Sequence, residues 1–355
     1  MSGPTSPFQG EDTGSSPVSR SSNYINMNKK IRVFSGTRPT GPLHLGNYLG
    51  GIKGYLDLQK RKDLDCIYGI MDLHGITSPY SPQKYPQQIK ELVLDYLACG
   101  LDPKKSHLLI QSQIPEHLEL AYYFSTIYPV SRLEQLPTYK EKKIEQPQYI
   151  NLGLLYYPIL MAADILIYKA ELVPVGKDQL PHLELTREVA RNFNHYFGKT
   201  FPEPQAYLTQ GAYIPALTGE GKMSKTKEDS YISLLDDLET IRRKLAKVPT
   251  DSGKGKKIPE NGGVYTLFTL IELFMTSDQR KKYEKQYLTT GIKYQPLKEE
   301  LAKIIFDYLK PIQSKRKYYE NKPNLIKQIV KDGKNYASQI AKKTIKEVKK
   351  KMGIS

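Results

Sequence analysis

The chain has 355 residues, of which 39% are apolar, and a formal net charge of +16 at pH 7; this is enough apolar material for about two domains with buried cores. It has no run of about 18 apolar residues, which excludes a membrane-spanning helix, and its two cysteines are too few for a four-cysteine zinc site or a cysteine-ligated iron–sulfur cluster. The positive charge favours a polyanionic partner such as RNA, although the lysine surplus of an A+T-rich genome would explain it equally well.

Residues 1–26 differ in composition from the rest of the chain. Ser, Gly, Pro and Thr dominate there and no apolar periodicity is present, which predicts a disordered N-terminal extension. The segment also lacks the long apolar core of a secretory signal.

From residue 27 to residue 230 the pattern alternates between strands and helices. Short β-prone runs predict strands at Ile31–Ser35, Cys66–Met71, His107–Gln111 and Leu172–Val175. Apolar residues at helical spacing predict helices at Leu43–Leu58, Ile89–Ala98 and Leu180–Phe193. This alternation predicts an α/β fold with a parallel sheet and helices on both of its faces. Cys66 and Cys99 fall in apolar stretches, where free thiols are typical of a reducing compartment such as the cytoplasm.

Beyond Ser230 the chain becomes rich in lysine and shows no strand-like alternation. Helical patterns are found at Ser233–Lys247, Val264–Met275, Leu297–Leu309 and Leu325–Lys351. We therefore expect a separate C-terminal α-helical domain over residues 231–355.

A first candidate for chemistry is the turn between the first predicted strand and the first predicted helix, Gly41–Tyr48. Backbone N–H groups at a helix N-terminus bind phosphate oxygens, and Gly46 leaves room for a nucleotide beside the backbone. His44 and Asn47 are three residues apart and can face the same ligand. The same pattern also fits an ordinary strand–helix turn with a polar cap.

A second candidate is Lys222-Met223-Ser224-Lys225-Thr226, which follows Gly219-Glu220-Gly221. Its two lysines and two hydroxyl residues suit a departing pyrophosphate, because cations stabilise the negative charge that develops in the transition state. In a chain this rich in lysine, a solvated loop explains the segment as well.

Taken together, the two segments resemble the paired motifs of the class I aminoacyl-tRNA synthetases, H-[IL]-G-[HN] and K-M-S-K-[ST]. This resemblance implies a Rossmann-type doubly wound sheet with ATP between the motifs. Further segments are similar to the tryptophan-specific members of the family: Phe34–Gly41, Ser131–Glu134, Thr138–Glu141, Gly153–Leu166, Val173–Gln179 and His182–Arg187. Asn47 stands where many class I enzymes have His, and Thr226 replaces the usual final Ser.

The resemblance implies a pocket for tryptophan in which Asp164 accepts the indole N–H. Indole is a large apolar ring with one donor, so such a pocket needs apolar walls and one buried acceptor. A helix-surface position for Asp164 is disfavoured by its apolar neighbours, and a lone buried acid needs a partner. The other residues that the resemblance assigns to this pocket are His74, Tyr157, Met161, Val173, Val175 and Gln179.

For ATP, the resemblance implies catalysis by positioning and charge through His44, Asn47, Lys222 and Lys225. The remaining implied ATP contacts are Arg38, Pro39, Thr40, Gly46, Lys142, Gly176, Lys177, Asp178, Ile214, Met223, Ser224 and Thr226. Arg38 stands where many tryptophan enzymes have Gln and could meet either ATP or the substrate carboxylate. We expect Mg²⁺ on the phosphates, no protein-held metal site, no structural zinc, and no iron–sulfur cluster, since Gly262-Gly263 occupies the region where a cysteine would be expected.

The resemblance thus predicts a cytoplasmic tryptophan–tRNA ligase that acts on L-tryptophan, ATP and tRNA(Trp). It also implies a homodimer formed through an insertion in the catalytic domain, with residues 231–355 binding the anticodon. Three alternatives stay open: a tyrosine enzyme of the same fold, a nucleotidyltransferase acting on a small metabolite, and a non-catalytic relative that binds RNA or protein.

Overall fold

The computed structural model describes residues 30–354 apart from positions 146, 209–212, 226 and 228. The expected disorder of residues 1–26 and the predicted ATP contact of Thr226 lie outside the described residues. In the described part of the chain, no helix has the length and apolar character that crossing a bilayer requires.

A five-stranded parallel sheet with the order β3-β2-β1-β4-β5 forms the centre of the molecule. Its strands are β1 (Ile31–Thr37), β2 (Leu64–Ile70), β3 (Ser106–Ile110), β4 (Leu172–Val175) and β5 (Gln205–Leu208). This order is that of a doubly wound nucleotide-binding sheet, so the predicted α/β fold and four of the strands are confirmed. The fifth strand was not predicted, because its residues are mostly exposed and form no apolar run.

The sheet separates two hydrophobic cores, because successive side chains of a strand point to opposite faces. In β2, Cys66 and Tyr68 pack into one core and Ile67 into the other. In β3, Leu108 and Leu109 divide in the same way. Strands buried on both faces have nearly continuous apolar sequences, which is why these runs were recognisable.

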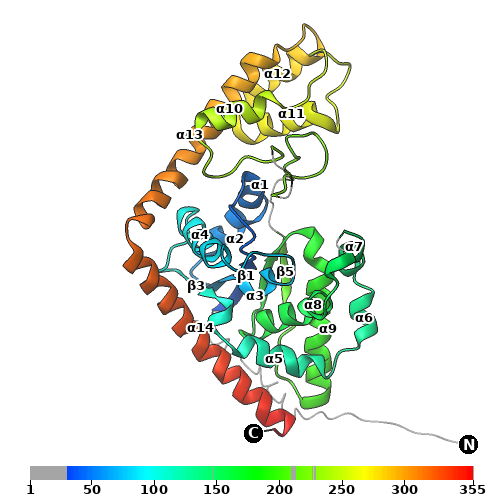
Figure 1. The fold of residues 1–355 in the computed structure, drawn as a ribbon, viewed down its shortest axis with the longest axis vertical. Coiled ribbons are helices and arrows are strands. Elements are labelled where there is room, and N and C mark those ends of the chain that lie inside the picture. The colour runs from blue at the N-terminus through cyan, green and yellow to red at the C-terminus, as the bar shows by residue number, and fades with distance from the viewer. Residues whose placement is uncertain (1–29, 146, 209–212, 226, 228, 355) are drawn as a thin grey trace, which may run out of the picture.

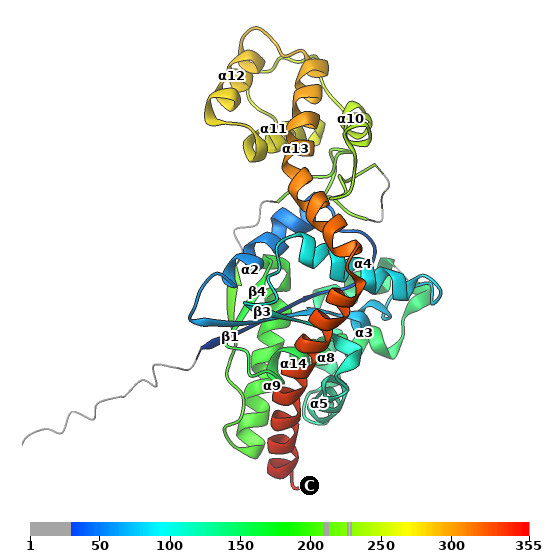
Figure 2. The same ribbon diagram turned by 90° about the vertical axis from the view of Figure 1, so that its left-hand side faces the viewer.

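The helices of the sheet domain lie on both sides of the strands (Figures 1 and 2). They are α1 (Leu45–Asn47), the π-helical η1 (Tyr48–Ile52), α2 (Lys53–Leu58), α3 (Asp72–Gly75), α4 (Tyr85–Ala98), η2 (Gln111–Gln113), α5 (Glu116–Ser125), α6 (Val130–Glu134), α7 (Pro137–Glu145), η3 (Pro147–Tyr149), α8 (Leu152–Leu166), η4 (Lys177–Gln179) and α9 (Leu180–Phe197). The helix predicted at Leu43–Leu58 starts two residues later and contains the π-helical turn.

The C-terminal helices are α10 (Leu238–Ala246), α11 (Gly262–Phe274), α12 (Ser277–Leu288), α13 (Tyr294–Glu320) and α14 (Pro323–Met352). The first of these was predicted to begin at Ser233, which is wrong: Ser233 pairs with His44 in an extended bridge, and the side chain of Asp237 caps the helix by accepting from the Thr240 N–H. Helix α12 was not predicted, because it is polar and buries only Tyr283 and Tyr287.

Helices α10, α11 and α12 gather at one end of the molecule, and α13 and α14 run from there along the sheet domain (Figure 1). Helix α14 crosses β3 (Figure 2). A Cβ added to Gly333 would lie 2.0 Å from the Leu108 carbonyl oxygen, and Ala337 and Ala341 on the same helix are fully buried. Small residues thus let α14 approach the sheet closely, so the last helix shares its core with the sheet domain.

We expect Gly333→Ala to lower the free energy of unfolding by about 1–3 kcal/mol, the usual cost of overpacking a core. The better helix propensity of alanine offsets part of this cost, but the methyl group meets strand backbone, which cannot rotate away. Urea denaturation measures the effect. The exposed neighbour Lys334→Ala is the control and should change stability by less than about 0.5 kcal/mol; equal stability of the two variants would contradict the close packing.

Candidate active site

A cavity of about 430 Å³ opens at the carboxyl ends of β1 and β4. These two strands lie side by side where the strand order reverses, which is where doubly wound sheets bind ligands. One wall is formed by residues 34–38 at the end of β1 and another by residues 173–176 at the end of β4. Helix α8 supplies the floor through Met161 and Asp164, which share a helix face as predicted.

Asp164 is the deepest polar group of this cavity and is 1% exposed. Its Oδ2 accepts from His74 Nε2 at 2.6 Å, and its Oδ1 accepts from His117 Nδ1 at 2.6 Å and from Gln111 Nε2 at 2.7 Å. Burial alone would raise the pKa of the carboxyl, but the two histidines lower it to about 2. Asp164 is therefore ionised near neutral pH, and its Oδ2 receives only one hydrogen bond from the described residues.

The other residues predicted for the amino-acid pocket all line the same cavity: His74, Tyr157, Met161, Val173, Val175 and Gln179. The phenol oxygen of Tyr157 lies 2.7 Å from His182 Nε2 and 2.9 Å from Thr138 Oγ1. This cluster of three side chains joins α7, α8 and α9 at one side of the cavity.

Gln111, His117, Thr138 and His182 were not assigned roles from the sequence. The first two are the partners that a buried Asp164 requires, so the need for partners was a usable signal. Their identity was not, because they lie 53 and 47 residues away from Asp164 in the chain. His182 is 2% exposed, and its Nδ1 has no hydrogen-bond partner among the described residues.

The first motif folds as a capped helix start. His44 Nδ1 accepts from the Asn47 N–H at 3.2 Å, and the Asn47 side chain accepts from the His44 N–H at 3.3 Å. Burial and the nearby charge of Lys225 lower the pKa of His44 to about 4. The imidazole is therefore neutral near pH 7. Because Nδ1 is the acceptor, Nε2 carries the hydrogen and can donate a hydrogen bond to a ligand.

The second motif lies directly against the first. The backbone of residues 43–45 pairs with that of residues 232–234, which follow the second motif in the chain, through the bonds Leu45 N–H to Ile232 O at 2.9 Å and Leu234 N–H to Leu43 O at 3.1 Å. A Cβ on Gly46 would meet Met223 Cβ at 3.2 Å. Segments about 180 residues apart in sequence thus form one wall, and glycine at position 46 avoids the crowding that a Cβ would cause with Met223 and with the His44 ring, which would be 3.0 Å away.

Lys225 reaches back to the first motif, and its Nζ donates to the Gly41 carbonyl at 2.8 Å. Partial burial, together with the charge of Arg38, lowers the pKa of Lys225 to about 8, although Asp95 opposes the shift. Lys222 is exposed on the same loop, and its backbone forms an isolated antiparallel β-bridge with that of Pro215.

The other predicted nucleotide contacts fall into two groups. Arg38, Lys142 and Gly176 line the cavity. Several remaining residues flank it or the two motifs: Pro39 and Thr40 precede Gly41, Lys177 and Asp178 follow Gly176, and Ile214 accepts from the Met223 N–H at 3.1 Å. Ser224 stands between Met223 and Lys225 and accepts from Ser230 Oγ through its carbonyl.

A family model described as tRNA synthetases class I (W and Y) matches residues 26–310. The chain belongs to this family. A tryptophan–tRNA ligase of Deinococcus radiodurans is 39% identical over 326 residues, which cover 91% of this chain and 98% of the relative. That of Caldanaerobacter subterraneus is 41% identical over 330 residues, with coverages of 91% and 98%.

Among solved structures, a tryptophanyl-tRNA synthetase of Campylobacter jejuni, complexed with ADP and tryptophan, superposes with a TM-score of 0.80 at 31% identity. The match covers 91% of this chain and all of that one. In the present chain, which is a class I synthetase, the cavity lies next to the wall that contains the two motifs. Arg38 connects them, because it lines the cavity and its charge acts on Lys225.

We expect Lys225 to lose its proton near pH 8 in the free synthetase. Its rate of acetylation by acetic anhydride, followed by mass spectrometry, should therefore rise steeply between about pH 7 and 9. Arg38→Gln should move this rise to higher pH, because it removes a positive charge that lowers the pKa of Lys225. The control is Arg132→Gln, which removes an exposed arginine on α6. An unchanged pH dependence of Lys225 acetylation in Arg38→Gln would contradict the proposed effect of Arg38 on the pKa of Lys225.

Proposed function

We propose that the chain is a tryptophan–tRNA ligase: it forms tryptophanyl-adenylate from L-tryptophan and ATP and transfers the tryptophanyl group to tRNA(Trp). The family match and the names of relatives at about 40% identity support this function. The observation that carries it is the buried, ionised Asp164 at the bottom of an apolar cavity.

The cavity suits an indole ring. Val173 and Val175 at the end of β4 and Met161 on α8 supply apolar walls, and the free position on Asp164 Oδ2 accepts the indole N–H. Such a site rejects analogues that lack the donor, because the carboxylate would be left buried with an unfilled position. The ammonium of tryptophan is bound by Tyr157 and Gln179, which line the same cavity and are more exposed than Asp164.

The first reaction step needs no protein nucleophile. The tryptophan carboxylate attacks the α-phosphate of ATP, the bond to the bridging oxygen breaks, and pyrophosphate leaves with Mg²⁺, which arrives on ATP as part of the substrate. The neutral imidazole of His44 donates a hydrogen bond from Nε2 to the phosphates. Because it carries no charge, it does not bind the negative charge of the ground-state triphosphate strongly. Lys222 and Lys225 provide positive charge where the pyrophosphate forms, so catalysis consists of positioning and electrostatic stabilisation. A hydroxyl of the terminal ribose of tRNA then attacks the adenylate carbonyl carbon, the bond from that carbon to the phosphate oxygen breaks, and AMP leaves.

ATP–pyrophosphate exchange with tryptophan, with tyrosine and with neither tests the proposal. We expect exchange with tryptophan alone. Asp164→Asn should reduce kcat/KM for tryptophan about 10- to 100-fold, the loss expected for a hydrogen bond to a charged group, with little change in the KM for ATP.

The same chemical change at an exposed site, Asp332→Asn on α14, should leave exchange unaltered. Exchange driven by tyrosine would identify a tyrosine enzyme instead, and no exchange with either amino acid would support one of the other two alternatives.

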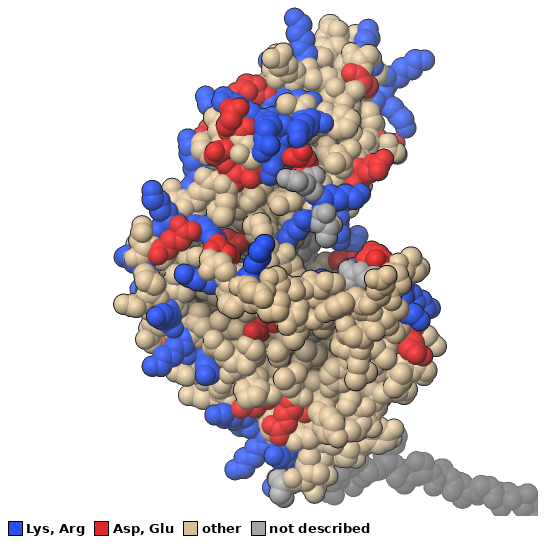
Figure 3. All heavy atoms as spheres, viewed as in Figure 1, with Lys and Arg blue, Asp and Glu red and all other residues tan. Residues whose placement is uncertain are grey.

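We further infer a homodimer formed through residues 116–152. Large apolar side chains in this insertion are exposed to an extent that is unusual for a monomer, and Figure 3 shows a broad, mostly uncharged area on this face of the lower part of the molecule, with charged groups at its edges. The exposed residues and their exposed fractions are Leu118 (47%), Tyr122 (66%), Val130 (59%), Ile144 (82%), Ile150 (43%) and Leu152 (77%).

Light scattering after size-exclusion chromatography should give about twice the chain mass of 40.6 kDa. Ile144→Asp should shift the protein toward the monomer, because a charge would be buried without a partner. Ile354→Asp makes the same change at a residue that is 50% exposed outside the insertion and should leave the mass unchanged. A monomeric unmodified chain would refute the inference.

For tRNA recognition, we propose that residues 231–355 contribute the anticodon-binding region, with α10, α11 and α12 as its distal part and α14 as its anchor on the sheet. Lysines of the distal part would contact phosphates. We place the reaction in the cytoplasm, where tRNA charging for translation takes place.

A further inference from the structure

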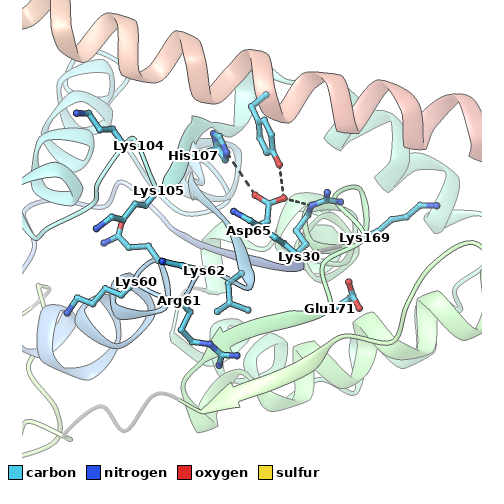
Figure 4. Close-up of a pocket in the computed structure, with 14 residues that line it drawn as sticks. Lys30, Lys60, Arg61, Lys62, Asp65, Lys104, Lys105, His107, Lys169 and Glu171 are labelled. Carbon is cyan, nitrogen blue, oxygen red and sulfur yellow. Dashed lines mark hydrogen bonds and ion pairs between the residues drawn. The ribbon is translucent and has the colours of Figure 1, made fainter. Parts of the chain in front are cut away.

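A second hollow, of about 1080 Å³, lies at the amino ends of the strands, opposite the cavity described above. We call it the basic hollow, because most of its lining is cationic (Figure 4). Six exposed cations surround it: Lys30, Lys60, Arg61, Lys62, Lys104 and Lys105.

The position of these cations follows from the sheet topology. Lys30 precedes β1, residues 60–62 precede β2, Lys104 and Lys105 precede β3, and Lys169 precedes β4. Because the strands are parallel, the loops that enter them meet at one edge of the sheet. Three of these loops therefore bring exposed positive charge to a common space, and Lys169 of the fourth pairs with Glu347 of α14 at 2.7 Å.

The acidic groups of the hollow are largely engaged within the protein. Asp65 Oδ2 accepts from Arg32 Nε at 3.0 Å and from the Tyr336 hydroxyl at 2.7 Å. The charge of Asp65 thus compensates Arg32 at the base of the hollow and leaves the surrounding lysines available to a ligand.

Ion pairs at the rim are exposed and exchangeable. Lys60 pairs with Asp57 at 2.5 Å and Lys105 with Asp102 at 3.5 Å, and these side chains are 37–71% exposed. Exposed pairs contribute about 0–1 kcal/mol each, so a phosphate can replace the carboxylate at little cost. Lys62 and Lys104 form no ion pair with any described residue.

An aromatic pair completes the wall beneath α14. The rings of His107 and Tyr336 stack at a centroid distance of 3.6 Å and an interplanar angle of 10°. Both residues are half-buried and line the hollow. Such a rigid flat group is a suitable surface for an unpaired base.

The donors favour a nucleic-acid backbone over a small anion. Small phosphates are typically held by backbone N–H groups at glycine-rich turns or helix N-termini, and the described residues that line the hollow include no glycine and no helix N-terminus. Long lysine side chains from several loops instead suit successive phosphates of an extended chain.

We propose that the basic hollow binds the phosphate backbone of the tRNA substrate. This inference rests on the proposed function for the identity of the RNA. Because the hollow and the amino-acid cavity lie at opposite ends of the strands, it contributes affinity for tRNA and takes no part in adenylate formation.

Fluorescence anisotropy with labelled tRNA(Trp) and the full chain, between 50 and 200 mM NaCl, tests the proposal. The double variant Lys62→Gln/Lys104→Gln should raise Kd roughly tenfold and reduce the slope of log K against log salt by about one for each lysine. Lys342→Gln/Lys346→Gln removes the same charge from exposed positions of α14 outside the hollow and should leave Kd within about twofold. Thermal unfolding of both variants checks that the fold is retained.

An equal loss of tRNA affinity in both double variants would overturn the proposal, because the loss would then reflect overall charge. Unchanged tRNA affinity in both double variants would also overturn it. Calorimetry with tripolyphosphate can give a third outcome. If tripolyphosphate binding depends on Lys62 and Lys104 but tRNA affinity does not, the hollow is a site for a small polyphosphate instead. ATP–pyrophosphate exchange with tryptophan is measured on the same samples and should be unchanged in the hollow variant. Absence of exchange in the unmodified chain would reject the proposed function while the dependence of RNA binding on the hollow could still be read.

Discussion

A charged carboxylate inside an apolar cavity is the constraint around which this molecule is organised. Removing an ion from water costs several kcal/mol, and Asp164 remains ionised only because His74, Gln111 and His117 donate to it. These donors come from α3, η2 and α5, which follow β2 and β3 in the chain. One buried charge therefore fixes the positions of several helices relative to α8, and the charge at the floor of the cavity depends on the same contacts that hold these helices together.

The second organising feature is backbone pairing between the first motif and the segment that follows the second motif. Neither residues 43–45 nor residues 232–234 belong to the main sheet, yet they pair as a short antiparallel bridge. His44 lies within this pairing and is buried, which together with the charge of Lys225 keeps its imidazole neutral, and Met223 of the second motif packs beside Gly46. Cations and neutral donors thus share one wall, as a reaction that develops charge on a leaving group requires.

Strands β1 to β4 were predictable because both of their faces are buried, whereas β5 and α12 were not, since exposed and polar residues carry no periodic signal. The pocket around Asp164 could be assigned through motif resemblance, and the residues near it on α8 and β4 were found for that reason. His117 and Gln111 were missed because only tertiary folding brings them to Asp164. The return of α14 to the sheet depends on Gly333 and two alanines, and small residues at a helix face do not reveal what they pack against.

A single carboxylate joins the distal helices to the turn of the first motif. One oxygen of Asp95 on α4 accepts from Arg316 of α13, and the other accepts from the Leu43 N–H at 3.3 Å, one residue before His44. Arg316 and Asp95 are almost fully buried, so separating them would strand a charge away from water. A swing of the α10–α12 end about α13 must therefore move the turn of the first motif with it or break this link.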